Sequence, residues 1–148
     1  MIDQTINLTF TAKRNRSGVL CVWCNELQSQ PSRKEKSEQI DIFAQVDSRW
    51  PHAMAFHAVN EGQKSIQYNV DLKKQGMRSG VSDLIIPHRF GDYPFVCIEL
   101  KRSNKKEAAA ITKDERDFLL ATEASGALAF VAYGYQAGMW MLFNAVAR

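Results

Sequence analysis

Two apolar runs in the middle of the chain end in charged residues. Residues 82–87 have the sequence SDLIIP, and residues 94–101 have the sequence PFVCIELK. β-Branched runs of this length bounded by proline predict buried strands, and the short polar loop between them predicts a hairpin. A charge is expensive to bury unless it is paired or binds a metal ion. Asp83, Glu99 and Lys101 at the strand ends therefore indicate a metal site or an opening in the fold.

The alternation of side chains along residues 95–101 places Glu99 and Lys101 on the same face, roughly 7 Å apart at their Cα atoms. If the hairpin pairs, the carboxylate of Asp83 reaches Glu99. Two carboxylates, the backbone carbonyl of Leu100 and water form an oxygen site suited to Mg²⁺ or Mn²⁺ rather than Zn²⁺. An ammonium group beside such an ion orients the attacking water or stabilises charge developing on a phosphoryl group, and this role is assigned to Lys101. The spacing alone also arises from salt bridges at strand ends.

A helix is predicted from Arg33 to Arg49. Ser32 and Glu35 form the S-x-x-E pattern of a capping box, and apolar residues follow at helical spacing. Counting back in steps of four from Val46 reaches Glu38, which therefore shares the stripe that faces the core. A carboxylate on this stripe indicates that Glu38 completes or positions the metal site.

The rest of the chain alternates between predicted strands and helices. The expected elements are a β-hairpin at residues 5–24, a strand at 52–59, a helix at 64–76, a helix that begins with the capping box Thr112–Glu115 and ends at Gly126, a strand at 127–133 and a helix at 136–147. In the helix at 64–76, Ile66 and Val70 are expected to face inward. Helices alternating with buried strands predict an α/β domain with a mixed sheet. We divide the chain into an N-terminal extension at residues 1–30 and a main domain at residues 31–148.

The composition indicates one globular domain inside the cell. A chain of 148 residues with 45% hydrophobic content is sufficient for one core. No apolar run approaches the roughly 20 residues that cross a bilayer, so no membrane partner is expected. Three cysteines cannot form a complete disulfide framework, and reduced thiols fit a cytoplasmic location.

The positive residues are clustered, although the net charge is only +3. One interpretation is an ordinary solvated surface. Several clusters, one of which continues directly from the strand with Glu99 and Lys101, favour a polyanionic partner such as nucleic acid. The clusters are Lys13, Arg14 and Arg16; Arg33, Lys34 and Lys36; and Lys101, Arg102, Lys105 and Lys106.

The motifs, taken in order, resemble a known nuclease family. ELK following SDL is similar to the PD-(D/E)XK nuclease motif, with Ser82 where that superfamily usually has proline. The stretches HAVNEGQKS, DLKKQGMRSGVSDLIIP, FVCIELKR and ITKDERDFLLATEASGALAFVAYG resemble the virus-type replication-repair nuclease (VRR-NUC) domain, over about residues 35–148. The resemblance implies a restriction-endonuclease-like fold, in which helices flank a mixed β-sheet. It also implies Mg²⁺ or Mn²⁺, hydrolysis of DNA phosphodiesters, and a homodimer acting on branched DNA in a bacterial or phage-infected cell.

The resemblance also assigns residues. Asp83 and Glu99 match the family's metal ligands, Lys101 its catalytic lysine and Glu38 its first-helix glutamate. Glu115 stands where many members have glutamine, and an accessory role stays open beside its capping role. The candidate DNA contacts are Arg33, Lys34, Lys36, His57, Asn60, Lys64, Lys73, Arg102, Lys105 and Lys106. His57 and Asn60 could equally satisfy backbone groups, and Lys73 could be a solvated helix residue.

The leading hypothesis is a metal-dependent DNA endonuclease that cuts structured DNA such as four-way junctions or flaps, as in DNA repair. One alternative is a non-catalytic module that binds structured DNA. Another is an exonuclease or restriction-type nuclease on the same scaffold. The preferred DNA structure, the number of metal ions and the role of residues 1–30 are left open by the sequence.

Overall fold

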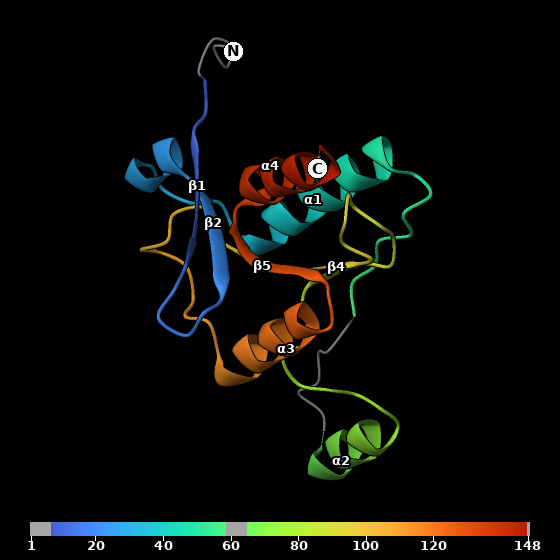
Figure 1. Ribbon diagram of the computed structural model, residues 1–148. Coiled ribbons are helices and arrows are strands. Elements are labelled where there is room, and N and C mark those ends of the chain that lie inside the picture. The colour runs from blue at the N-terminus through green and yellow to red at the C-terminus, as the bar shows by residue number, and fades with distance from the viewer. Residues whose placement is uncertain (1–6, 59–64, 148) are drawn as a thin grey trace.

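The computed structural model describes residues 7–58 and 65–147, which form a mixed sheet between helices (Figure 1). The sheet has five strands in the order β1-β2-β5-β4-β3. The strands are β1 (Phe10–Arg14), β2 (Leu20–Cys24), β3 (Leu84–Ile86), β4 (Val96–Lys101) and β5 (Leu128–Tyr133). The helices are a 3₁₀ turn η1 (Asn25–Ser29), α1 (Glu35–Arg49), α2 (Ile66–Lys74), α3 (Lys113–Ala124) and α4 (Tyr135–Val146).

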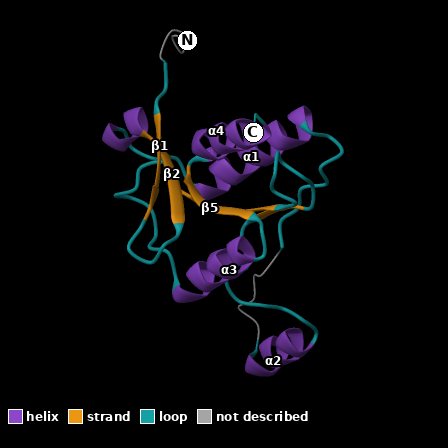
Figure 2. Cartoon of the chain, viewed as in Figure 1, coloured by secondary structure: helices purple, strands orange, loops and turns teal. Residues whose placement is uncertain are grey.

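Helices cover both faces of the sheet (Figure 2). On one face, Ile42 of α1 and Leu142 of α4 pack against the strands, with Phe130 at the centre. On the other face, Leu119 of α3 packs against Cys97 and Val131. The predicted α/β fold with a mixed sheet is therefore confirmed. None of the described helices is long and apolar enough to cross a bilayer.

The N-terminal hairpin forms as predicted and widens the sheet by two strands. β1 and β2 pair antiparallel, and β2 pairs parallel with β5. The turn is closed by the side chain of Asn15, which accepts hydrogen bonds from the backbone N–H groups of Ser17 and Val19, at 3.0 Å each. Gly18 supplies the positive φ of 89° that this turn requires. The division of the chain at residue 30 stays a prediction, and the pairing with β5 makes the hairpin continuous with the main sheet.

The central hairpin also forms as predicted. β3 and β4 pair antiparallel, with Leu84 opposite Ile98, and β4 continues parallel to β5. The six residues of β4 are all buried, which explains their continuous apolar character up to Glu99.

One of the two predicted capping boxes is wrong. Helix α1 begins at Glu35 without a side-chain cap. The Ser32 hydroxyl instead accepts a hydrogen bond from Asn104 N–H at 2.8 Å, and the Ser32 N–H donates to Glu107 Oε1 at 2.6 Å. The loop after β4 therefore occupies the groups that a cap would need. The capping box at Thr112 and Glu115 is confirmed, with both reciprocal hydrogen bonds present.

Two further predictions failed between α1 and β3. The strand expected at residues 52–59 is reduced, in the part the structure describes, to one bridge between Phe56 and Ile85. Helix α2 forms, but Ile66 is 85% exposed and Val70 is 40% exposed, so neither faces inward. The reason is that α2 lies apart from the sheet and the other helices, where no layer covers its apolar residues (Figure 1).

Candidate functional site

Glu99 and Lys101 lie side by side at the end of β4, on the face of the sheet that α3 covers. Each is only 4% exposed. Cys97, two residues earlier on the same face, packs against Leu119 of α3. The predicted alternation along β4 is therefore confirmed, and it brings a carboxyl group and an ammonium group into the same buried region.

Asp83 immediately precedes β3 and is tied to the same end of β4. Its Oδ2 accepts a hydrogen bond from the backbone N–H of Leu100 at 2.8 Å. Its backbone carbonyl accepts a hydrogen bond from His57 Nδ1 at 2.7 Å. The hairpin thus fixes Asp83 beside Glu99, while His57 holds the backbone of the residue that precedes β3.

Glu115, on the first turn of α3, is the closest acidic partner of Lys101. Their Nζ and Oε1 atoms are 3.0 Å apart, whereas Lys101 Nζ lies 4.0 Å from Glu99 Oε1. Burial acts to raise the pKa of Glu115, but the hydrogen bond from the Thr112 backbone and the Lys101 ammonium outweigh it and lower the pKa. Glu115 therefore stays ionised and fixes the position of Lys101.

Glu99 carries an unsatisfied buried oxygen. Burial, and then the negative charges of Asp83 and Glu115, raise the pKa of Glu99 to about 10. Its Oε2 is buried without a hydrogen-bond partner. Negative charge is thus concentrated beyond what Lys101 balances, and a divalent cation that prefers carboxylate oxygens suits this site.

The carboxylates do not yet form a closed metal cage. Within residues 7–58 and 65–147, no three or more His, Cys, Asp or Glu side chains converge on one point. Asp83 and Glu99 would therefore share the ion with water or a backbone carbonyl, which is usual for Mg²⁺. The Leu100 carbonyl as a ligand stays a prediction.

Glu35 is the carboxylate of α1 whose pKa is affected by charges of this cluster, those of Asp83 and Lys101. Burial, and then the negative charge of Asp83, raise the pKa of Glu35. Glu38 is buried as predicted, at 2% exposed, but it is bound elsewhere. It accepts a hydrogen bond from Tyr135 N–H at 2.9 Å and forms an ion pair with Arg33 at 3.1 Å.

The structure therefore records contacts of Glu38 with the start of α4 and not with Asp83 or Glu99. Sequence reasoning missed Glu35 because the S-x-x-E pattern assigned it to a cap. Its spacing of three residues from Glu38 was the available signal, since such residues are neighbours on a helix.

The predicted DNA contacts occupy varied environments. Arg33 is held by Glu38 and by Asp41, at 2.7 Å, and its guanidinium lies over the ring of Tyr135, so it has a structural role. Lys105 Nζ lies 3.3 Å from the ring centroid of Trp23. Arg102 is half-buried; Lys34, Lys36, Lys73 and Lys106 are exposed; and Asn60 and Lys64 lie outside the described residues.

Comparison with known proteins supports the fold. No family model matches the chain, and no curated protein matches it. A solved structure described as "VRR_NUC domain protein" superimposes with a TM-score of 0.65 at 17% sequence identity, covering 80% of this chain and 92% of that one. The chain therefore has the fold of a VRR_NUC domain, as the sequence motifs indicated.

Proposed function

We propose that this chain, which has the VRR_NUC fold, is a Mg²⁺- or Mn²⁺-dependent endonuclease that hydrolyses phosphodiester bonds in branched DNA. The observation that carries the proposal is the buried cluster at the end of β4. It combines Asp83, Lys101 and a Glu99 oxygen that has no partner. The overlap of this cluster with the motifs of a nuclease fold supports the same conclusion.

Each side chain has a distinct task. A divalent cation bound by Asp83 and Glu99 would polarise a phosphoryl oxygen and acidify a bound water. Lys101, oriented by Glu115, donates hydrogen bonds to the phosphate and stabilises the negative charge of the transition state. Glu35 accepts a hydrogen bond from the attacking water.

The surrounding cations support a DNA substrate. The loop that carries Arg102, Lys105 and Lys106 leaves β4 directly after Lys101, so it places positive charge beside the cluster. Contacts to phosphates carry little sequence information and suit recognition of DNA by shape. Preference for four-way junctions or flaps, a homodimer and an intracellular location stay predictions within this proposal.

The test is a cleavage panel on labelled four-way junction, flap and linear duplex, with Mg²⁺, Mn²⁺, Ca²⁺ or EDTA. Cleavage is expected with Mg²⁺ or Mn²⁺ only, and Asp83→Ala or Lys101→Ala should reduce its rate at least 100-fold. Asp92→Ala, which removes an exposed carboxylate from the loop between β3 and β4, is the control and should cleave normally.

The same panel separates the alternatives. A non-catalytic module would bind junctions in EDTA but release no product with any metal ion, which would refute the proposal. Stepwise loss of terminal nucleotides would indicate an exonuclease, and cutting of linear duplex at fixed sequences a restriction-type enzyme. Light scattering with and without DNA measures whether the chain is a dimer.

A further inference from the structure

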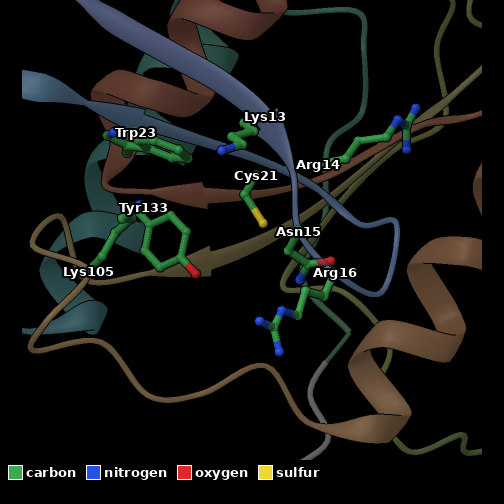
Figure 3. A pocket seen from close by; sticks show the side chains of 8 residues that line it. All are labelled: Lys13, Arg14, Asn15, Arg16, Cys21, Trp23, Lys105 and Tyr133. Atoms are coloured by element: carbon green, nitrogen blue, oxygen red, sulfur yellow. The ribbon is translucent and has the colours of Figure 1, made fainter.

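A groove lies on the α3 face of the sheet, beside the candidate active site. Its volume is about 490 Å³. The lining side chains project from the β1–β2 hairpin, from β5 and from the loop after β4 (Figure 3). They are Lys13, Arg14, Asn15, Arg16, Cys21, Trp23, Lys105 and Tyr133. None of them belongs to the cluster of Asp83, Glu99 and Lys101.

Strand register connects the groove to that cluster. Trp23 of β2 is the partner of Tyr133 of β5, and Tyr133 is the partner of Lys101 of β4. Trp23 and Tyr133 also pack on the α3 side, where Lys101 points. Neighbouring strands are about 4.8 Å apart, so the row from Trp23 to Lys101 spans roughly 10 Å. The groove thus adjoins the candidate active site on the same face of the sheet, and its Trp23 lies two strands away from Lys101.

The groove is electropositive. Among the described residues, Lys13 and Arg16 form no ion pair, whereas Arg14 is held by Glu123 of α3 at 2.9 Å. Lys105 adds a third cation, held on the face of Trp23. The hydroxyl of Tyr133 is uncharged at neutral pH, as is usual for a phenol, and burial and then the proximity of Cys21 raise its pKa further, to about 12.

The loop that carries Lys105 is preorganised. The buried Asn104 side chain donates to the carbonyl of Gln30 at 2.8 Å, and Gln28 donates to the carbonyl of Ser103 at 2.8 Å. The Lys105 N–H in turn donates to Gln28 Oε1 at 3.0 Å. These bonds fasten the loop to the segment after β2, so the groove keeps its cation and its aromatic wall together without a ligand.

We propose that this groove binds an unpaired single strand of the DNA substrate next to the scissile phosphate. Lys13 and Arg16 would contact its phosphates, and the rings of Trp23 and Tyr133 its bases. The proposal rests on the proposed function. Cations combined with aromatic rings are how proteins hold single strands, and phosphate contacts alone would serve a duplex equally well. The volume of about 490 Å³ lies in the range of small-ligand pockets, about 300–1,000 Å³, so the groove has room for nucleotides of one strand.

The test measures binding in EDTA, so that it does not depend on cleavage. Two labelled DNAs are compared, a blunt duplex and the same duplex with a single-stranded arm. Wild-type protein should bind the armed DNA about 10-fold more tightly. Lys13→Gln/Arg16→Gln should lose most of this preference, and its slope of log affinity against log salt should fall by about 1.4, since each single-strand phosphate contact contributes about 0.7.

The matched control is Arg49→Gln/Arg89→Gln. It removes the same charge from the last residue of α1 and from the loop after β3, at the opposite edge of the sheet from β1. It should keep the preference and the slope on the armed DNA. Trp23→Phe should remove the fluorescence quenching that the arm causes, with an unchanged circular dichroism spectrum.

Equal affinity for the two DNAs, or equal losses in the groove variant and the control, would overturn this inference. The groove assignment can be wrong even if the protein shows metal-dependent cleavage. Conversely, a protein that prefers armed DNA but cleaves nothing would contradict the proposed enzyme and leave the groove assignment in place.

Discussion

The ammonium of Lys101 lies 3.0 Å from Glu115 Oε1, closer than its 4.0 Å distance to Glu99 Oε1. Glu115 also closes the capping box of α3 with Thr112. One carboxylate thus holds both Lys101, the proposed catalytic lysine, and the start of α3. Many members of the family that the sequence resembles have glutamine at this position. A glutamine oxygen could also accept the hydrogen bonds from Lys101 and from the Thr112 N–H.

Glu115 is therefore predicted to act as a positioning residue. Glu115→Gln keeps the acceptor oxygen and should retain the cleavage rate within several-fold. Glu115→Ala removes it, and should lower the cleavage rate at least 10-fold and the free energy of unfolding by about 1 kcal/mol, as for a lost helix cap. Single-turnover cleavage and urea unfolding measure the two effects. Equal cleavage by Glu115→Ala and wild type would contradict the positioning role.

Glu35 and Glu38 should separate in function, although they lie one turn apart. Glu35→Gln is expected to reduce cleavage at least 10-fold with stability unchanged, because the negative charge of Asp83 acts on the Glu35 carboxylate, which therefore lies near the candidate site. Glu38→Gln is expected to destabilise the protein by about 1–3 kcal/mol, since it weakens the contacts with Arg33 and Tyr135. Thermal unfolding and cleavage are measured for both variants. The opposite pattern would return the role at the metal site to Glu38.

Glu99 should destabilise the metal-free protein. Its pKa is about 10 in the folded state, against 4.5 as the ordinary value, so the folded state holds a proton that the unfolded state has lost in this window. Stability in EDTA should therefore fall as pH rises from about 4.5 towards 10. Glu99→Gln should flatten this decline and raise stability at pH 8 by about 1–3 kcal/mol.

Added metal should make wild type more stable than Glu99→Gln. Mn²⁺ should stabilise wild type and leave Glu99→Gln unchanged, because a ligand stabilises only the state that binds it. Unfolding curves at several pH values, with EDTA or Mn²⁺, check both statements. A Glu99→Gln variant that is stabilised by Mn²⁺ as strongly as wild type would remove Glu99 from the metal site.

Gly80 should be intolerant of substitution. Its φ is +82°, and a Cβ atom there would lie 2.3 Å from the backbone carbon of Asp114 at the start of α3. This close approach lets the segment before Asp83 pass under α3. Gly80→Ala is expected to cost more than about 2 kcal/mol of unfolding free energy. Gly76→Ala has a comparable φ of +105° with open space around it, and should cost less.

The sequence predicted those features of the site that depend on local geometry. The two-residue period of β4 is enough to place Glu99 and Lys101 on one face, and pairing of adjacent strands brings in Asp83. Helical counting correctly predicted that Glu38 is buried. It could not predict what Glu38 contacts there, because that depends on where α4 begins, at Tyr135, far away in the sequence.

Local patterns failed where distant segments compete for the same groups. Ser32 has the sequence context of a helix cap, but its hydroxyl and N–H form hydrogen bonds with Asn104 and Glu107 instead. Ile66 and Val70 have amphipathic spacing, yet α2 has no layer to cover. In both cases the deciding partner is absent from the neighbouring sequence, so no window of residues could reveal it.

The parallel pairing of β2 with β5 has a consequence for biogenesis. Leu20–Cys24 emerges early from the ribosome, but its partner strand, Leu128–Tyr133, emerges late. An isolated hairpin is marginally stable in water, so the early strands must wait for the late one before they are secured. The groove proposed to bind DNA is therefore joined to the proposed catalytic centre only when β5 pairs with both β2 and β4.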